Sequence, residues 1–306
     1  MRIGIAATRL AGVDGVTFET VKWEIVLEQL GHEMRLVAGD VDALRPNTRL
    51  IPPMHFTHPP VLEVASAAFE PTADRAELRR KIRRLADQLL PPLRDWVTRN
   101  QLDAMIVENA WAIPMHLPLG VALRDLAAET GLPTIGHHHD YWWERERFAT
   151  CVVPDVLAAA FPPDLPNVRH VSINSLAAAQ LLERRGLSST VVPNVFDFDQ
   201  PRPSAARRQQ VRAQLRRELG MRDEGLLVVQ PTRVVPRKGI ELAIELVGRL
   251  ADPDAVLLIT SPAGDEGTEY LVTLERLADR WNVRLRYAAD RFAPDLVGKR
   301  LNPAHS

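Results

Sequence analysis

Three histidines and an aspartate stand side by side in the segment 136–140, GHHHD, and such residues bind metals and move protons. They follow residues 132–135, which predict a strand, so they lie where open α/β sheets bind their ligands. Successive residues of an extended chain point to alternate faces, so at most two of these histidines can share one ion without a turn. A metal hydrolase using His137, His139 and Asp140 is one hypothesis. Core packing explains one or two of the histidines but hardly all three.

The next segment, 140–148 (DYWWERERF), combines aromatic rings with paired charges. Aromatic faces suit the C–H-rich faces of sugars, and Glu and Arg can hold hydroxyls or a carboxylate, so this composition favours a carbohydrate acceptor. The candidate acceptor-binding residues come from this segment and from the end of the strand predicted at 104–107: Asp140, Tyr141, Glu144, Arg145, Glu108 and Asn109. The alternative is a helix whose aromatic residues are buried and whose charges pair at i,i+3 or i,i+4.

Three cations, Arg233, Arg237 and Lys238, follow a predicted strand and precede a predicted helix. The dipole at a helix N-terminus favours anions, so cations gathered there indicate an anionic ligand. Arg233 and Lys238 are positioned to neutralise a diphosphate leaving group, which is electrostatic catalysis. A purely structural surface role is the alternative.

A glycine-bearing loop, with Gly12 and Gly15, joins the first predicted strand (3–7) to the first predicted helix (18–30). Backbone N–H groups and a helix N-terminus at such a place favour a diphosphate. The spacing by itself is also that of a plain strand-to-helix turn.

Strand and helix patterns alternate along the chain, which predicts an α/β fold with parallel sheets. Residues 1–198 form a complete doubly wound domain with a long amphipathic helix at 75–99. Pro201 and Pro203 lie in a polar linker. Residues 199–306 then supply strands at 226–230, 255–260 and 283–287, about half of a six-stranded Rossmann-like domain.

The composition excludes several function classes. The 306 residues are 46% hydrophobic and 25% charged, enough for one or two domains with real cores. A net charge of -1 gives no basic field for nucleic acid. The one cysteine, Cys151, forms no intrachain disulfide and fits a cytoplasmic protein. No apolar run approaches the roughly 20 residues of a membrane helix, so we expect no transmembrane segment.

In their order and spacing, these motifs make the chain resemble family 4 retaining glycosyltransferases, which have two Rossmann-like domains in the GT-B arrangement. Further matching pieces are the segment 30–33 (LGHE), Ser175 and the segment 192–197 (VPNVFD). The resemblance implies transfer of a hexose from a nucleoside diphosphate sugar to a small polar or carbohydrate acceptor, with retention of configuration. The leaving diphosphate helps to deprotonate the acceptor hydroxyl, and no metal or other cofactor is required.

The resemblance also implies roles for particular residues. His139, counted from Pro133, matches the histidine beside the transferred sugar. Arg233 and Lys238 match the pair that binds the donor diphosphate. Gly12 and Gly15 match the loop that approaches the phosphates from the first domain.

The chain departs from the family in its last part, because residues 289–306 contain no glutamate to match the family's Glu-x7-Glu segment. In a sheet of order 3-2-1-4-5-6, ending after strand 3 leaves the strand at 226–230 as an unpaired edge. We therefore expect a truncated second domain whose edge another copy of the chain covers in a homo-oligomer. A non-catalytic module that holds a nucleotide or an acceptor is the alternative function. A dehydrogenase is disfavoured, because no G-x-G-x-x-G loop occurs in the required context.

Overall fold

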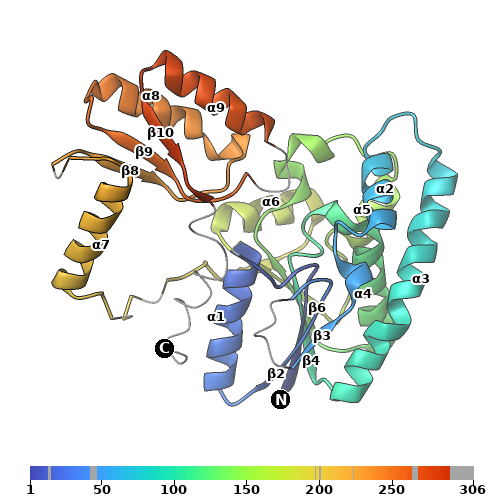
Figure 1. The fold of residues 1–306 in the computed structure, drawn as a ribbon. Helices are drawn as coiled ribbons and strands as arrows, with labels where there is room; N and C mark the ends of the chain where they lie inside the picture. Colours follow the sequence, from blue (N-terminus) through green and yellow to red (C-terminus); the bar gives the residue numbers. More distant parts are fainter. Residues whose placement is uncertain are drawn as a thin grey trace. The chain divides into compact units, whose positions relative to one another are not determined.

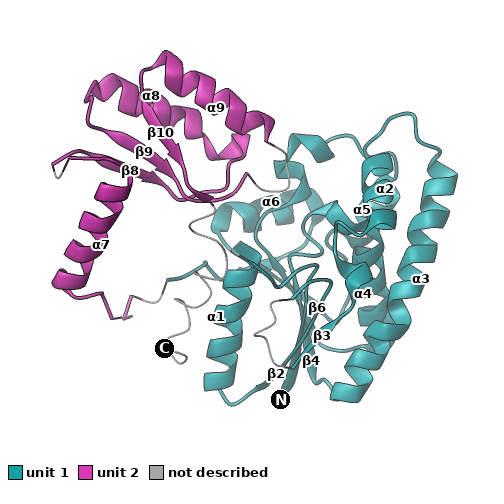
Figure 2. Cartoon of the chain, in the orientation of Figure 1, with its two compact units in different colours: residues 1–196 teal, residues 197–306 magenta. Residues whose placement is uncertain are grey.

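The computed structural model describes residues 1–12, 15–41, 47–196, 198–199, 201–222, 224–263 and 268–289. Figure 1 shows strands and helices alternating along the chain, which confirms the predicted α/β class. Two compact units divide the chain at residues 1–196 and 197–306 (Figure 2), two residues before the boundary that the sequence predicts.

Unit 1 is built on a seven-stranded parallel sheet with the strand order β3-β2-β1-β4-β5-β6-β7. The strands are β1 (Arg2–Ala6), β2 (Glu33–Ala38), β3 (Thr48–Leu50), β4 (Ala104–Glu108), β5 (Thr134–His138), β6 (Val168–Ser172) and β7 (Ser189–Val191). The helices are α1 (Gly15–Gln29), α2 (Pro59–Ala68), α3 (Arg75–Asn100), α4 (Leu117–Thr130), α5 (Pro154–Ala160) and α6 (Ser175–Arg185). Because β1, β4 and β5 run parallel, their carboxyl ends lie at one edge of the sheet. The strand order reverses between β1 and β4, and such sheets bind ligands at the carboxyl ends beside this point.

The long helix α3 forms because capping and periodicity agree. The side chain of Asp74 accepts hydrogen bonds from the backbone N–H groups of Ala76 and Glu77, which caps the first turn. Buried apolar residues recur at helical spacing toward the core: Leu78, Ile82, Ala86, Leu89, Leu93 and Trp96. Arginines on the other side pair with neighbouring elements, such as Arg94 with Glu129.

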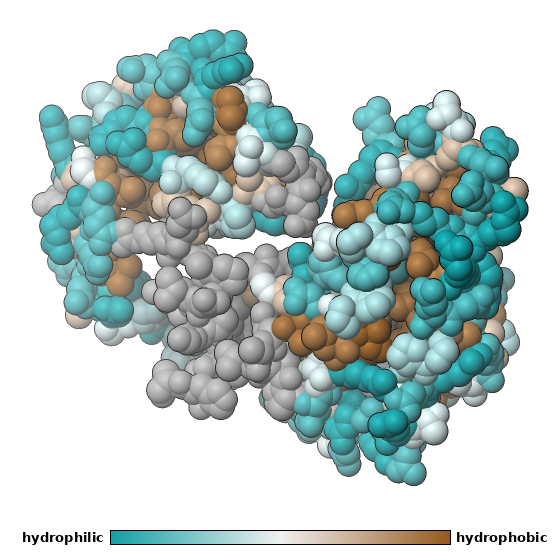
Figure 3. Space-filling view, turned by 45° about the vertical axis from the view of Figure 1, so that its right-hand side comes forward, coloured by the Kyte–Doolittle hydropathy of each residue, from teal (hydrophilic) through white to brown (hydrophobic). Residues whose placement is uncertain are grey.

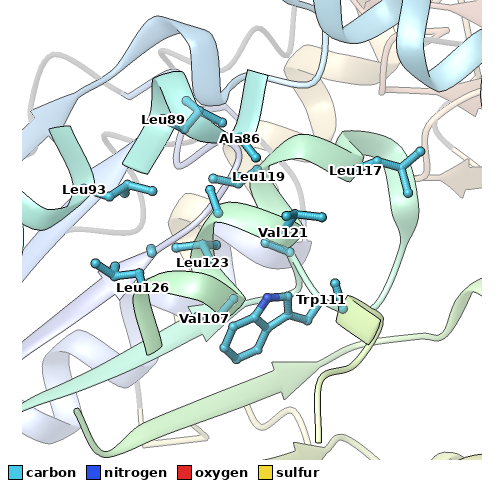
Figure 4. Close-up of a cluster of buried hydrophobic side chains, with 14 of the residues drawn as sticks. Ala86, Leu89, Leu93, Val107, Trp111, Leu117, Leu119, Val121, Leu123 and Leu126 are labelled. Atoms are coloured by element: carbon cyan, nitrogen blue, oxygen red, sulfur yellow. The ribbon is translucent and has the colours of Figure 1, made fainter. Parts of the chain in front are cut away.

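The main core of unit 1 lies between α3, α4 and the sheet, and Figure 4 shows part of it. Trp111 is fully buried there, and its indole Nε1 donates to the backbone oxygen of Gly120 at 3.0 Å. Gly120 also allows the ring of Phe161 to pack closely, because a Cβ at that position would lie 2.2 Å from it. The hydrogen bond to Gly120 satisfies the buried indole of Trp111, as is usual for polar groups in a core.

Gly39, just after β2, supports a specific stability prediction. A Cβ at this position would lie 2.0 Å from the backbone nitrogen of His55, and no side-chain rotation can relieve a clash with backbone. We expect Gly39→Ala to lower the free energy of unfolding by about 2–3 kcal/mol in urea titrations. Gly186→Ala is the matched control: Gly186 has φ 67° with no atom near its Cβ position, so we expect a loss of about 1 kcal/mol. Equal losses for the two variants would contradict the packing argument.

Unit 2 contains a three-stranded parallel sheet with the order β10-β9-β8. Its strands are β8 (Leu227–Gln230), β9 (Val256–Ile259) and β10 (Arg284–Tyr287), and its helices are α7 (Ala205–Glu218), α8 (Ile240–Leu250) and α9 (Glu269–Arg280). Within the described part of the chain, β8 pairs with β9 alone, so β8 is an edge strand as the sequence predicts.

On the face drawn in Figure 3, hydrophilic side chains cover most of the described surface of each unit, and apolar side chains gather in smaller patches. None of the described helices has the length and apolar character that a bilayer-spanning helix requires.

Candidate active site

A buried carboxylate joins two of the three histidines at the carboxyl ends of β4 and β5. Glu108, the last residue of β4, is in register with His137 of β5. One oxygen of Glu108, Oε2, lies 2.9 Å from His137 Nδ1, and the other, Oε1, lies 2.7 Å from His139 Nε2. The side chains of Glu108 and His137 are 0% exposed, whereas that of His139 is 12% exposed. His139 is therefore the member of this cluster that a ligand can reach.

The cluster stabilises separated charge. Burial alone would raise the pKa of Glu108, but its hydrogen bonds and charge interactions with His137 and His139 outweigh burial and lower that pKa. Burial alone would lower the pKa of His139, but the hydrogen bond and charge of Glu108 outweigh it and raise that pKa. The favoured state is therefore an ionised carboxylate next to an imidazole that readily holds a proton.

His138 points to the opposite side of β5, as the alternation of an extended chain predicts. Its Nε2 lies 3.0 Å from Nδ1 of His170, whose Nε2 donates to the backbone oxygen of Pro163 at 3.1 Å. Since His170 Nδ1 is thereby left as an acceptor, His138 Nε2 carries the hydrogen. Burial lowers the pKa of His138 well below 6.5 and that of His170 to about 4. These two histidines are neutral packing residues.

Another buried histidine, His116, caps α4. Its Nδ1 accepts from the backbone N–H of Leu119 at 3.0 Å, and its Nε2 donates to the backbone oxygen of Pro53 at 2.9 Å. Burial lowers the pKa of His116 from its ordinary value of 6.5 to about 4. Protonation would add a proton at Nδ1 and break the hydrogen bond that caps the helix.

The depressed pKa values of His116 and His170 predict how stability depends on pH. The unfolded chain binds more protons than the folded one between the unfolded pKa of 6.5 and the folded pKa of about 4, so stability is lost as pH falls through this window. From pH 7 to about pH 5, each histidine removes about 2 kcal/mol from the free energy of unfolding. Urea titrations at the two pH values measure the loss, and His170→Gln should reduce it. An unchanged or rising urea midpoint at the lower pH would contradict this assignment.

The metal-hydrolase hypothesis named Asp140 as a ligand beside His137 and His139, and the structure does not bring Asp140 to them. The carboxylate of Asp140 accepts a hydrogen bond from Arg145 Nε at 2.8 Å, and it does not join the histidines. Among the described residues, Glu108, His137 and His139 form the group whose ligand atoms lie within 4.8 Å of one another. The separations of 2.9 and 2.7 Å are those of ordinary hydrogen bonds between the Glu108 carboxylate and the two imidazoles.

Tyr141, a predicted acceptor-binding residue, is buried. Its side chain is 0% exposed, its hydroxyl lies 2.9 Å from Ser172 Oγ, and its ring stacks on Trp143 with centroids 4.5 Å apart. Burial raises the pKa of Tyr141 to about 12. A ring without exposed surface cannot pack on a sugar, so Tyr141 is a core residue. The segment 140–148 contains two short 3-10 turns, η3 (Trp142–Glu144) and η4 (Glu146–Phe148), rather than one helix.

The other acceptor candidates divide into two groups. Glu108 and Asn109 use their side-chain oxygens on the histidines, since Asn109 Oδ1 accepts from the backbone N–H of His139 at 3.0 Å. Asp140 and Arg145 form a partly exposed ion pair. Glu144 accepts a hydrogen bond from the backbone N–H of Tyr141 at 2.8 Å, and burial raises its pKa. Asp140, Glu144 and Arg145 therefore stay as candidates for contact with a ligand.

The predicted diphosphate ligands lie on loops of both units. Lys238 ends the 3-10 turn η5 (Pro236–Lys238), and Gly239, at φ 59°, leads into α8. Val234 and Val235 are buried and anchor this loop, whereas Lys238 is exposed and Arg233 is half-buried. In unit 1, Gly12 has φ 74° and Gly15 begins α1; residues 13–14 between them lie outside the described residues. A Cβ at either glycine would meet no atom within 4 Å.

Comparison with known proteins identifies the family. No protein-family model matches the sequence. The chain is 31% identical over 315 residues to the mannosylglucosylglycerate synthase of Thermotoga maritima, covering 93% of this chain and 69% of that protein. It is 29% identical over 310 residues to the enzyme of the same name from Petrotoga mobilis, covering 94% and 70%. The chain belongs to the mannosylglucosylglycerate synthase family of glycosyltransferases.

Two solved structures share the fold of this chain. The sucrose-phosphate synthase of Thermosynechococcus elongatus superposes with a TM-score of 0.63 at 14% identity, over 94% of this chain and 70% of that one. Anabaena HepE, solved with UDP-glucose, superposes with a TM-score of 0.61 at 12% identity, over 94% and 69%. The resemblance to GT-B glycosyltransferases and the predicted fold class are confirmed.

Proposed function

We propose that this chain transfers a mannosyl residue from a nucleoside diphosphate sugar to glucosylglycerate, a small polar acceptor, with retention of anomeric configuration. The observation that carries the proposal is the 31% identity to a mannosylglucosylglycerate synthase along 93% of the chain. It extends over both units, so it includes the histidine cluster of unit 1 and the cationic loop of unit 2.

The proposed reaction forms a bond between an acceptor hydroxyl oxygen and the anomeric carbon and breaks the bond from that carbon to the diphosphate. The hydroxyl proton passes to the leaving diphosphate, so no separate base is needed. Arg233 and Lys238 neutralise the charge that develops on the diphosphate, which stabilises the transition state more than the ground state. Within unit 1, the backbone at Gly12 and Gly15, beside the start of α1, suits an anion such as a phosphate.

The acceptor in this proposal carries a carboxylate, and Arg145 suits it. The guanidinium of Arg145 is held by Asp140, yet both side chains are partly exposed, at 21% and 25%. A planar guanidinium can bind one carboxylate through one edge and a second through the other. His139, which is 12% exposed, lies beside the transferred sugar.

The test is a transfer assay on the purified chain with glucosylglycerate as acceptor and UDP, GDP and ADP conjugates of mannose and glucose as donors. We expect one nucleotide to support formation of a mannosylated product, and an NMR spectrum of that product to show the donor's anomeric configuration. Nucleotide binding without transfer would favour the non-catalytic module. A folded protein that binds no nucleotide sugar would contradict the proposal.

A further inference from the structure

The end of β4 holds His139 from two sides. Glu108 Oε1 lies 2.7 Å from the ring nitrogen Nε2 of His139. The next residue, Asn109, accepts a hydrogen bond from the backbone N–H of the same histidine at 3.0 Å. Two consecutive residues of one strand end therefore determine the position of both the ring and the backbone of a residue about 30 positions later in the chain.

The backbone of Asn109 makes these two contacts possible. Its φ of 54° lies in the left-handed region, which asparagine tolerates better than most residues. Its N–H donates to the backbone oxygen of His137 at 2.8 Å, which extends the pairing of β4 with β5 by one step. The turn after this bond brings the Asn109 amide back to the backbone of His139. A residue at φ 54° next to a functional cluster is the kind of strained position that the surrounding contacts must maintain.

The second oxygen of Glu108 is also occupied. His137 Nδ1 lies 2.9 Å from Oε2, and both side chains are 0% exposed. The aromatic ring of Trp23 lies against His137, with centroids 5.0 Å apart. Glu108 therefore has no freedom to turn toward a ligand, and its chemical effect must pass through the histidines.

An ionised carboxylate only accepts hydrogen bonds, so the Nε2 atom that faces Glu108 must carry a hydrogen. Nδ1 is then the ring nitrogen of His139 left for a ligand, as an acceptor in the neutral ring and as a donor in the imidazolium. We propose that Glu108 and Asn109 are positioning residues that fix the tautomer and orientation of His139, so that Nδ1 is the nitrogen that meets the substrate. The inference rests on the proposed function, in which His139 lies beside the transferred sugar. The lowered pKa of Glu108 agrees with it, because it keeps the carboxylate ionised.

The first test detects by NMR which ring nitrogen of His139 carries the hydrogen, and it does not depend on enzyme activity. In the 15N-labelled protein, at a pH above the pKa of His139, long-range correlation of ring protons and nitrogens distinguishes a protonated nitrogen from a bare one. We expect the hydrogen on Nε2 and a bare Nδ1. A hydrogen on Nδ1 would overturn the inference whatever the enzyme does. The signals that disappear in the spectrum of the His139→Gln variant are those of the His139 ring.

The second test measures transfer by Glu108→Gln, Glu108→Asp and Asn109→Gly. The amide introduced by Glu108→Gln replaces one acceptor oxygen with an NH2 donor, so it cannot accept from both histidines as the two carboxylate oxygens do. We expect kcat to fall between about 10- and 100-fold, with the KM for the donor nearly unchanged, because Arg233 and Lys238 are untouched. Glu108→Asp keeps the charge and should recover part of kcat. Asn109→Gly accepts the positive φ, so it should fold and still lose kcat.

These outcomes separate two kinds of failure. If the unmodified chain transfers sugar and the folded variants keep its kcat, the positioning role is wrong and the proposed function stands. If the unmodified chain transfers no sugar, the proposed function fails, and the ring spectrum still decides the tautomer of His139. Melting temperatures show which variants are folded; if Glu108→Gln does not fold, Asn109→Gly decides the kinetic test.

Discussion

Replacing His139 with alanine should lower kcat about 100- to 1,000-fold, the usual cost of removing one preorganised polar group from a transition-state site. His139 is the one partly exposed member of the cluster with Glu108 and His137, and its pKa is raised by that carboxylate. The KM for the nucleotide sugar should change little, because the proposed diphosphate ligands, Arg233 and Lys238, are untouched. Initial rates at saturating donor and acceptor measure the effect.

The control for His139→Ala is His32→Ala, which removes a half-buried histidine of the same unit away from the cluster. It should leave kcat within about twofold, since a side chain without contact to the substrate contributes little to transition-state binding. His139→Ala also leaves Glu108 buried with one partner, so its melting temperature is measured beside its rate. A folded His139→Ala protein with the parent kcat would remove His139 from the site.

The double variant Arg233→Ala, Lys238→Ala should weaken nucleotide binding about 100-fold or more. Each charge-assisted bond to a phosphate contributes about 1.5–3 kcal/mol, and both are lost together. Because ligand binding stabilises the native state by mass action, the rise in melting temperature with nucleoside diphosphate should disappear at concentrations that saturate the parent chain. Thermal shift and calorimetric titration with UDP, GDP and ADP measure it.

The matched control for this loop is Arg249→Ala. Arg249 is an exposed cation of the same unit that pairs with Glu245 one turn earlier in α8, so its loss removes a positive charge without touching the loop. It should keep the nucleotide-dependent shift. A shift retained in the double variant, or lost equally in Arg249→Ala, would mean that the diphosphate does not bind between Arg233 and Lys238.

The sequence alone determined the layout of the fold. Alternating strand and helix patterns predicted a parallel sheet, and α3 was predicted at 75–99 and lies at Arg75–Asn100. Local signals sufficed because capping by Asp74 and the 3.6-residue spacing of apolar side chains are properties of neighbouring residues. The same local logic placed His137 and His139 on one side of β5 and His138 on the other.

Only the tertiary structure decided which of these residues work together. Glu108 is 29 residues from His137 and 31 from His139, so its role depends on the register of β4 against β5, which no local pattern reveals. An acidic residue at the end of the neighbouring strand was the one available signal, and it suggested acceptor binding instead. Tyr141 and Asp140 looked equally available in the sequence, but packing against Trp143 buried the first and Arg145 engaged the second. Residue types and spacing can be read locally, whereas partners and burial depend on contacts between segments far apart in the chain.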